Sequence, residues 1–350
     1  MDKVRYGMIG FGGIAENRLA KEGFACDKTR FTPLEDAVLI GATDVNPARR
    51  AAVEKLGLKW YDSAAALLAD PEIEAVVIAT NNRTHHDLAV QAMDAGRHVI
   101  VEKPLSTNSE LAADLVERAA KAGLSLAVDH MMVNNCLNKK ARQIVASGVL
   151  GKIEDSCFHM QFPYGYEPAE AASWRCSCIE EMGGPIGDVA SHCFYVMEFV
   201  LGKKIKAVHA SYYPKLMSIK AEDGAVIRCE LDDGTLASVF VSFCERRGGA
   251  AGTFSGLGYE VYGERGALRG YGTMFQLSGY SDEPYPIRLE LDYGDHVETF
   301  RPENPSNIYQ GVVCAHAKAI REGLRLTGED GLHNVELCEE AHASARSKNK

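Results

Sequence analysis

Apolar residues in the first third of the chain form short continuous runs. The runs lie at 4–10, 37–44, 74–80, 97–104 and 124–130, and they alternate with segments of helical periodicity at 63–70, 86–96 and 109–123. Continuous apolar strands separated by helices are typical of parallel βαβ units whose sheet is covered on both faces. The pattern predicts an α/β domain with a doubly wound parallel sheet over residues 1–128.

Beyond about residue 150 the pattern changes to longer strand-like runs, at 152–162, 225–243, 259–272 and 287–300. Turn pairs at Asp233-Gly234, Arg265-Gly266 and Gly294-Asp295 divide the later runs into hairpins. Residues 129–350 are therefore predicted to form an α+β domain with a large, mostly antiparallel sheet. Helices are expected near Pro185, at 307–323 and at 332–347, and the last is a candidate for packing back on the first domain.

Composition excludes several classes of function. The 350 residues are 46% apolar, and 38 basic against 48 acidic residues give a net charge of −10, which would repel a nucleic acid backbone. No apolar stretch approaches the roughly 20 residues that span a bilayer, and no signal peptide is recognisable, so a cytoplasmic protein is expected. The ten cysteines are expected to be reduced. Cys176 and Cys178 match neither zinc nor redox spacing, and no metal is predicted.

A glycine motif follows the first apolar run. Gly10, Gly12 and Ala15 form G-x-G-x-x-A where a strand passes into a helix, the place at which a pyrophosphate approaches backbone NH groups. Asp44 ends the second run, where a carboxylate accepts hydrogen bonds from ribose hydroxyls. The same carboxylate would repel a 2'-phosphate, so NAD is favoured. Arg49 and Arg50 keep NADP as the alternative.

The segment ATNNRTHHDLAVQAMDAGRHVIVEKPL, residues 79–105, resembles the signature of the Gfo/Idh/MocA oxidoreductases. The positions in register with that signature are Thr80, Asn82, His85, Glu102, Lys103 and Pro104, whereas Asn81 stands where the family usually has proline. The resemblance continues at 146–153, 173–175, 183–192 and 327–345. It implies a Rossmann domain followed by a domain with a large open sheet, often used for assembly into dimers or tetramers, and substrates that are mostly sugars and cyclitols.

The stretch GGPIGDVASHCF, residues 183–194, has three interpretations from its residues alone: a metal site, an acid/base pair, or an ordinary helix start. Pro185 suits a first helical turn, so Asp188 and His192 would share one helix face. The resemblance makes them the D-x-x-x-H pair of the family and makes Lys103 the lysine of its E-K-P motif, with a cis bond to Pro104.

Oxidation of a secondary alcohol needs a base and a group that steadies the developing alkoxide. We therefore expect His192 to exchange the proton, Asp188 to bind substrate hydroxyls or orient His192, and Lys103 to polarise the reacting oxygen. The predicted substrate contacts are Lys103, His159, Tyr164, Arg175, Asp188 and His192, with Tyr166 as a further candidate. The predicted cofactor contacts are Gly10, Phe11, Gly12, Gly13, Ile14, Ala15, Asp44, Thr80, Asn82, His85, Glu102, Lys103 and His130.

Together these features predict an NAD(P)-dependent oxidoreductase that transfers a hydride between nicotinamide and a secondary hydroxyl or ketone of a sugar, glycoside or cyclitol. A homodimer or homotetramer is expected. Two alternatives remain open: glycoside cleavage assisted by catalytic NAD, and a non-catalytic NAD-binding regulator. Asn134 and Asn135 stand where family members often have an arginine, so the substrate is not specified.

Overall fold

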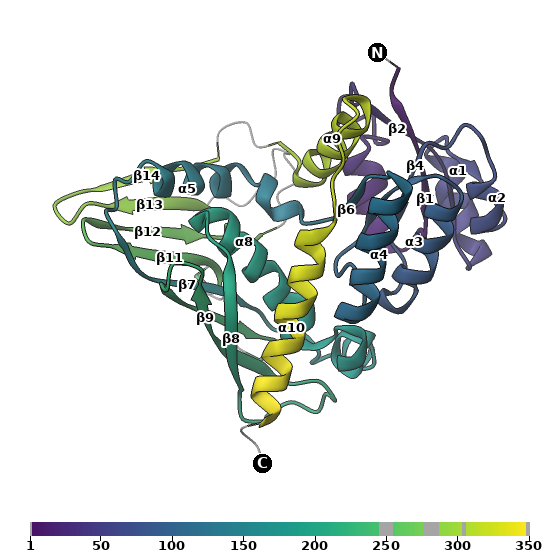
Figure 1. Ribbon diagram of the computed structural model, residues 1–350. Coiled ribbons are helices and arrows are strands. Elements are labelled where there is room, and N and C mark those ends of the chain that lie inside the picture. The colour runs from purple at the N-terminus through teal and green to yellow at the C-terminus, as the bar shows by residue number, and fades with distance from the viewer. Residues whose placement is uncertain (1, 245–254, 276–286, 303–305, 348–350) are drawn as a thin grey trace. The chain divides into compact units, whose positions relative to one another are not determined.

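The computed structural model describes residues 2–244, 255–275, 287–302 and 306–347, and it divides into two compact units (Figure 1). Unit 1 comprises Met1–Met131 and Ser306–Val335, and unit 2 comprises Met132–Pro305 and Glu336–Lys350. The sequence-based division at residue 128 differs from these units mainly in the segment 306–335, which is grouped with unit 1. Among the described residues, no helix is both long and apolar enough to cross a bilayer.

Unit 1 is built on a six-stranded parallel sheet. Its strands are β1 (Val4–Ile9), β2 (Ala37–Thr43), β3 (Lys59–Trp60), β4 (Ala75–Ile78), β5 (His98–Val101) and β6 (Leu126–Val128), in the order β3-β2-β1-β4-β5-β6. This is the doubly wound order of a dinucleotide-binding domain, and its direction reverses between β1 and β4. The predicted fold class of the first domain is confirmed.

Helices flank this sheet in unit 1. They are a π-helix (Ala15–Gly23), α1 (Arg50–Lys55), α2 (Ala64–Leu68), α3 (His85–Asp94), α4 (Ser109–Ala122), α9 (Ile308–Arg321) and the start of α10 (Glu329–Ser347). The Asn108 side chain caps the first turn of α4, and Gly123 ends it with a φ of 69°. On α9, His316 Nδ1 lies 2.9 Å from the hydroxyl of Tyr6, which ties this late segment to β1.

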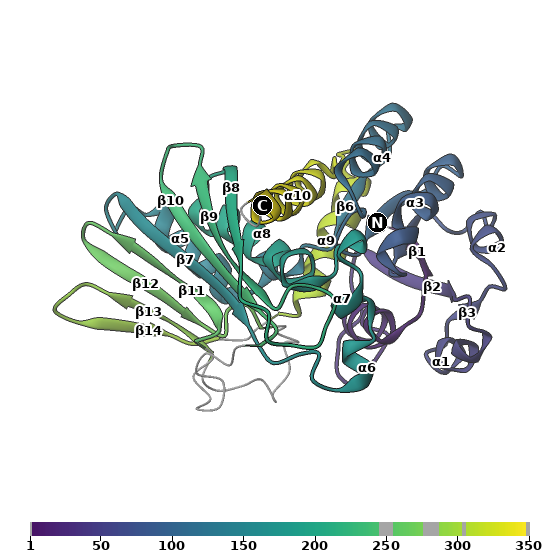
Figure 2. The same cartoon turned by 90° about the horizontal axis from the view of Figure 1, so that it is seen from below.

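Unit 2 is built on an eight-stranded sheet, seen from a second side in Figure 2. Its strands are β7 (Ile153–Gln161), β8 (Ile205–Tyr212), β9 (Gly224–Leu231), β10 (Leu236–Ser242), β11 (Leu257–Gly263), β12 (Gly266–Tyr271), β13 (Arg288–Asp292) and β14 (Val297–Phe300). The order is β14-β13-β12-β11-β7-β10-β9-β8, and only the β7–β10 pair is parallel among them. The predicted mostly antiparallel sheet and its three hairpins are confirmed.

The helices of unit 2 include α5 (Cys136–Ala146), α6 (Pro168–Ala171), α7 (Trp174–Ser177), a π-helix (Pro185–Ala190), α8 (Ser191–Leu201) and the end of α10. Of these, α5, the π-helix and α8 pack on one face of the sheet. Phe158 and Tyr259 are buried side by side on that face, and the Tyr259 hydroxyl donates to Asn138 of α5 at 2.9 Å. Side chains alternate along a strand. Glu260, which follows Tyr259 on β11, therefore lies on the opposite face of the sheet, and it is partly exposed.

The end of α10 protects the edge strand β8 (Figure 1). The backbone NH of Val208 donates to Glu340 Oε1, and the NH of Ala210 donates to the hydroxyl of Ser344, both at 3.2 Å. An edge strand with free NH groups is a template for unwanted pairing. These side chains satisfy two of those groups and so block that edge.

Candidate active site

The predicted cofactor residues of unit 1 lie where the parallel strands end. Gly10 follows β1, Asp44 follows β2, Thr80 follows β4, Glu102 follows β5 and His130 follows β6. Backbone hydrogen bonds link several of these segments directly, including Gly10 NH to Thr43 O and Glu102 NH to Ile78 O, both at 2.9 Å. The carboxyl ends of the strands, at the reversal between β1 and β4, are where such folds bind their ligands.

The glycine loop leaves room at this edge. Gly10 has a φ of +89°, and a Cβ there would lie 2.6 Å from the carbonyl oxygen of Ala79, so only glycine fits. Built on Gly12 or Gly13, a Cβ would meet no atom within 4 Å. The space beside these two residues fits a phosphate group that approaches the backbone. Phe11 is buried, Ile14 is partly exposed, and Ala15 begins the π-helix.

Asp44 is held at the end of β2 by two backbone donors. Its Oδ2 accepts from the NH of Phe11 at 2.6 Å, and its Oδ1 accepts from the NH of Asn46 at 2.8 Å. Arg49 pairs with Glu16 and donates to the Phe11 carbonyl at 2.6 Å. Since Asp44 is an acceptor and Arg49 already has partners, this arrangement favours ribose hydroxyls over a 2'-phosphate.

His85 braces the loop that carries Lys103. The imidazole is fully buried; Nδ1 lies 2.8 Å from the carbonyl oxygen of Pro104, and Nε2 lies 3.3 Å from that of Thr80. Burial lowers the pKa of His85, and the contacts with the Pro104 and Thr80 carbonyls oppose this. The Lys103–Pro104 peptide bond is cis, as the resemblance implies. Buried in this way, His85 holds the loop through the Pro104 carbonyl, and its contact with the cofactor stays a prediction.

The remaining predicted residues of unit 1 are placed as follows. Asn82 is buried at the start of the 3-10 turn Asn82–Thr84, and Thr80 accepts from the Thr84 hydroxyl at 2.8 Å. Glu102 and Lys103 are half-buried at the end of β5. His130 is buried, and its Nδ1 lies 3.0 Å from Asp330.

Asp129 is a residue that sequence reasoning missed. It lies between β6 and His130 with 1% of its surface exposed, and neither carboxylate oxygen has a hydrogen-bond partner among the described residues. Burial raises its pKa well above the ordinary value, the nearby Glu102 adds to this, and Lys103 opposes it. The Asp129 carboxyl therefore interacts electrostatically with both Glu102 and Lys103.

In unit 2, Asp188 and Arg175 form an ion pair. Arg175 Nε donates to Asp188 Oδ2 at 3.1 Å, and the Asp188 side chain is nearly buried. The negative charge of Asp188 has the largest effect and raises the pKa of Arg175. Burial lowers this pKa, and Tyr164 raises it further. The predicted substrate residues Tyr164, Arg175 and Asp188 are therefore brought together. Tyr166 is exposed, and its hydroxyl donates to the carbonyl of Cys244 at 3.3 Å.

His192 is buried one turn further along. Its Nδ1 lies 2.7 Å from the hydroxyl of Tyr195, and the two rings meet edge to face. Tyr195 was not predicted, although its i+3 spacing from His192 places it within reach on a helix.

The helix start differs from the expected α-helix. Pro185–Ala190 form a π-helix that leads into α8 at Ser191, and such turns are frequent at functional sites. Tertiary contacts explain the local geometry. A Cβ on Gly187 would lie 2.4 Å from the Met182 carbonyl oxygen, and one on Gly184, whose φ is +78°, would lie 2.4 Å from Glu222 Oε2.

The carboxylate of Glu222 binds the first turn of this π-helix. Its Oε1 accepts from the NH of Ile186 at 2.8 Å. Burial raises the pKa of Glu222 to about 7, against the hydrogen bond from Ile186 and the positive charges of Lys215 and Arg346. Nothing in the sequence indicated a role for Glu222, which lies 34 residues beyond Asp188.

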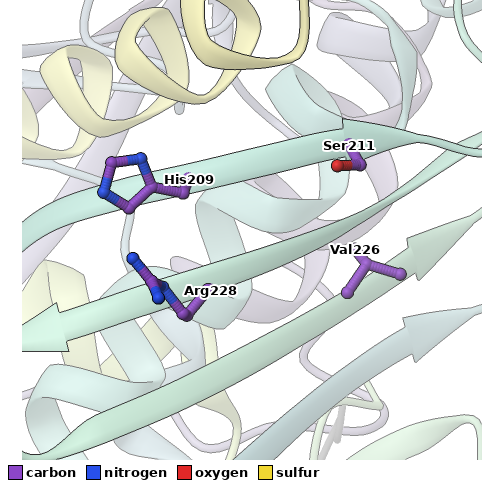
Figure 3. A pocket seen from close by; sticks show the side chains of 4 residues that line it. All are labelled: His209, Ser211, Val226 and Arg228. Carbon is purple, nitrogen blue, oxygen red and sulfur yellow. The ribbon is translucent and has the colours of Figure 1, made fainter. Parts of the chain in front are cut away.

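Two features lie on the other face of the eight-stranded sheet. His159 extends from β7 on the side opposite Phe158, away from α5, so the structure does not bring it together with Arg175 and Asp188. A pocket between β8 and β9 is lined by His209, Ser211, Val226 and Arg228, and Figure 3 looks onto it with the helices behind the strands. None of the predicted site residues lines this pocket.

Family models match both parts of the chain. The model described as oxidoreductase family, NAD-binding Rossmann fold, matches residues 4–130, and the GFO/IDH/MocA C-terminal domain matches residues 138–269. The chain belongs to the Gfo/Idh/MocA oxidoreductase family. Its first unit is the NAD-binding Rossmann domain of that family, and the expected fold, family and cofactor class are confirmed.

Curated members of this family match along most of the chain. A 1,5-anhydro-D-fructose reductase of Ensifer adhaerens is 28% identical over 95% of this chain and 93% of its own length. A myo-inositol 2-dehydrogenase of Thermotoga maritima is 26% identical over 94% and 92%. In fold, the chain is similar to an aldose-aldose oxidoreductase of Caulobacter crescentus, with a TM-score of 0.84, 18% identity and coverage of 99% and 98%.

Asn135 stands where family members often have an arginine, and it has a structural role in this chain. Its Oδ1 accepts from the NH of Leu137 and caps α5, and its Nδ2 donates to the Thr273 carbonyl at 3.1 Å. It is completely buried.

Proposed function

We propose that this chain is an NAD-dependent dehydrogenase or reductase that transfers a hydride between nicotinamide and a secondary hydroxyl or ketone of a sugar, glycoside or cyclitol. The observation that supports it most is the edge of the six-stranded sheet, where the open glycine loop, Asp44 and the braced Lys103 loop follow neighbouring strands. Unit 2 supplies two hydrogen-bonded pairs of polar side chains, Arg175 with Asp188 and His192 with Tyr195.

The residues present fit the cofactor. The open space at Gly12 and Gly13 suits the pyrophosphate, and Asp44 suits the adenosine ribose. NAD, when bound, accepts or returns the hydride. The positions of Glu102, Thr80 and His130 at the ends of β5, β4 and β6 make them the proposed neighbours of the cofactor on the nicotinamide side.

The proposed division of labour follows the chemistry of each group. Lys103 places a positive charge at the substrate oxygen and stabilises the alkoxide character that develops there. His192 takes the hydroxyl proton during oxidation and returns it during reduction, and the hydroxyl of Tyr195 fixes the orientation of its ring. Asp188, held by Arg175, accepts hydrogen bonds from substrate hydroxyls.

Asp129 is a further residue of this proposal, because its buried carboxyl interacts electrostatically with Lys103. A buried carboxyl with a raised pKa is neutral at lower pH and becomes an anion beside the lysine as the pH rises. That anion would add a negative charge beside Lys103, the residue proposed to polarise the substrate oxygen. Asp129 is thus a proposed positioning residue that acts through Lys103.

The substrate class rests on the relatives. The two curated relatives are named for the reduction of an anhydro-ketose and the oxidation of an inositol, both polyhydroxylated six-carbon compounds. Formation of NADH, or its consumption with the matching ketones, across a panel of hexoses, inositols, anhydro sugars and glycosides tests the proposal. Cleavage of a glycoside with no net NADH would favour the elimination chemistry instead, and NAD binding without any turnover would favour a regulator.

We also propose that the protein is a homodimer or homotetramer that associates through the sheet face opposite α5 and α8. That face carries a continuous cross-strand row of polar residues, which are Arg228, Ser238, Cys157, Glu260, Arg269 and Glu290. Light scattering on the purified protein tests the assembly, and Arg269→Glu should weaken it. A monomer at micromolar concentration would contradict it.

A further inference from the structure

Three metal-binding side chains meet in the middle of the eight-stranded sheet. Cys157 and His159 are two residues apart on β7, so they share one face of the strand. Glu260 of β11 lies directly opposite Cys157 in the antiparallel register. One donor atom from each of the three side chains lies within 4.8 Å of the others.

The distance between the first two donors suits a metal ion. Cys157 Sγ and His159 Nδ1 are 3.6 Å apart. In a tetrahedral zinc site with a Zn–S distance of about 2.3 Å and a Zn–N distance of about 2.0–2.1 Å, sulfur and nitrogen are separated by about 3.6 Å. The two atoms are hydrogen bonded to each other in this structure, and the same separation suits two ligands of one ion.

Glu260 completes the arrangement from the other side of the ring. Its carboxylate is hydrogen bonded to His159 Nε2. A carboxylate that accepts this NH fixes the tautomer in which Nδ1 carries the lone pair, and metal-binding histidines are commonly oriented in this way. The ring of Phe240, at a centroid distance of 5.9 Å, also packs beside the imidazole, which is 1% exposed.

We propose that this cluster is a binding site for Zn²⁺ or a similar thiophilic divalent cation, with Cys157 Sγ and His159 Nδ1 as ligands and Glu260 as the residue that positions the imidazole. In the single chain, Cys157 and Glu260 are only partly buried, so the remaining coordination positions are open to solvent or to a ligand from a second copy of the chain. Thiolate and imidazole donors select Zn²⁺ over Mg²⁺ or Ca²⁺, which prefer oxygen. From the sequence we expected no metal and expected His159 to contact the substrate, so this proposal differs from both expectations.

The site is separate from the proposed hydride-transfer chemistry. The cluster lies on the sheet face opposite Phe158 and α5, whereas Arg175, Asp188 and His192 belong to the helices and loops of the covered face. The ion would bind two residues of β7, and Glu260 of the adjacent strand β11 would hold the imidazole ligand in place. Its expected role is to stabilise unit 2, so the proposal and the proposed function can fail independently.

Co²⁺ titration of the full-length protein, purified in the presence of a chelator and then freed of it, tests the site. Wild type should bind one Co²⁺ per chain with the near-ultraviolet band of a cobalt–thiolate bond, and Zn²⁺ should displace the cobalt and raise the unfolding temperature. Cys157→Ser, a small change at a half-buried position, should abolish the band and the Zn²⁺-dependent rise. His159→Gln should do the same.

Two further variants sharpen the test. Glu260→Gln should keep the cobalt spectrum but weaken affinity by about 10–100-fold, the usual effect of losing a carboxylate that orients a ligand. Cys178→Ser, which removes another half-buried thiol, should change nothing. A wild-type protein with no thiolate band at millimolar Co²⁺, or a Cys157→Ser variant that retains it, would overturn the proposal.

Discussion

Glu222 gives the most quantitative prediction, because its burial links stability to pH. The structure raises its pKa from 4.5 to about 7, with desolvation as the largest cause. The folded state therefore binds a proton more tightly than the unfolded chain. The contribution of Glu222 to stability is fully present below pH 4.5 and is lost as the pH rises through 7.

The magnitude follows from the shift in pKa. A rise in pKa from 4.5 to about 7 corresponds to about 3 kcal/mol in the free energy of unfolding, most of which is lost between pH 5 and pH 8. Glu222→Gln keeps an oxygen that can accept from the NH of Ile186 but cannot ionise. Relative to wild type, this variant should become more stable by about that amount as the pH rises over the same range.

Urea unfolding at several pH values, followed by the fluorescence of Trp174 and Trp60 and by circular dichroism, measures this difference. Glu230→Gln, at a half-exposed position of β9, is the matched control and should run parallel to wild type. A free-energy difference between Glu222→Gln and wild type that stays constant from pH 5 to pH 8 would refute the inference that Glu222 titrates near neutrality.

Other changes test the remaining parts of the proposed site. Gly10→Ala should weaken NAD binding at least about tenfold, because its Cβ would meet the Ala79 carbonyl and its φ is left-handed; undiminished affinity by calorimetry would contradict this. Tyr195→Phe should lower kcat by about tenfold through a misoriented His192, while Tyr212→Phe, which removes the similar hydroxyl contact to His342, should not; equal effects would argue against the orienting role. Asp129→Asn should change the pH profile of kcat with NAD affinity unchanged, since the variant has no carboxyl that can ionise beside Lys103; an identical profile would remove Asp129 from the proposal.

The repeating pattern of the chain was enough to predict the architecture. Continuous apolar runs separated by helices specified the parallel sheet, and the turns at Gly234, Gly266 and Gly294 marked the hairpins β9–β10, β11–β12 and β13–β14. Neither β8 nor α5 was predicted. The segment that forms α5, CLNKKARQIVA, is polar on much of its surface, and its start depends on the cap by Asn135.

Burial and long-range pairing account for what sequence reasoning missed in the sites. Asp129 and Glu222 matter because their carboxyls are buried, and no local pattern reveals this. The i, i+2 spacing of Cys157 and His159 indicates a shared strand face, but Glu260 lies 101 residues from His159 and joins them only through the strand register. The π-helix at Pro185–Ala190 likewise depends on the close approach of Gly187 to Met182.

The central claim is that this family member oxidises or reduces a polyhydroxylated substrate with Lys103 and His192. Its most direct test is NADH formation from NAD and a panel of inositols, hexoses and anhydro sugars, measured in parallel with NAD affinity. Wild type and the exposed-site control Lys206→Met should turn over at least one substrate. Lys103→Met and His192→Ala should bind NAD but lose turnover. Undiminished turnover in either of these variants, or no NADH from any substrate and none consumed in the reverse direction, would contradict the account.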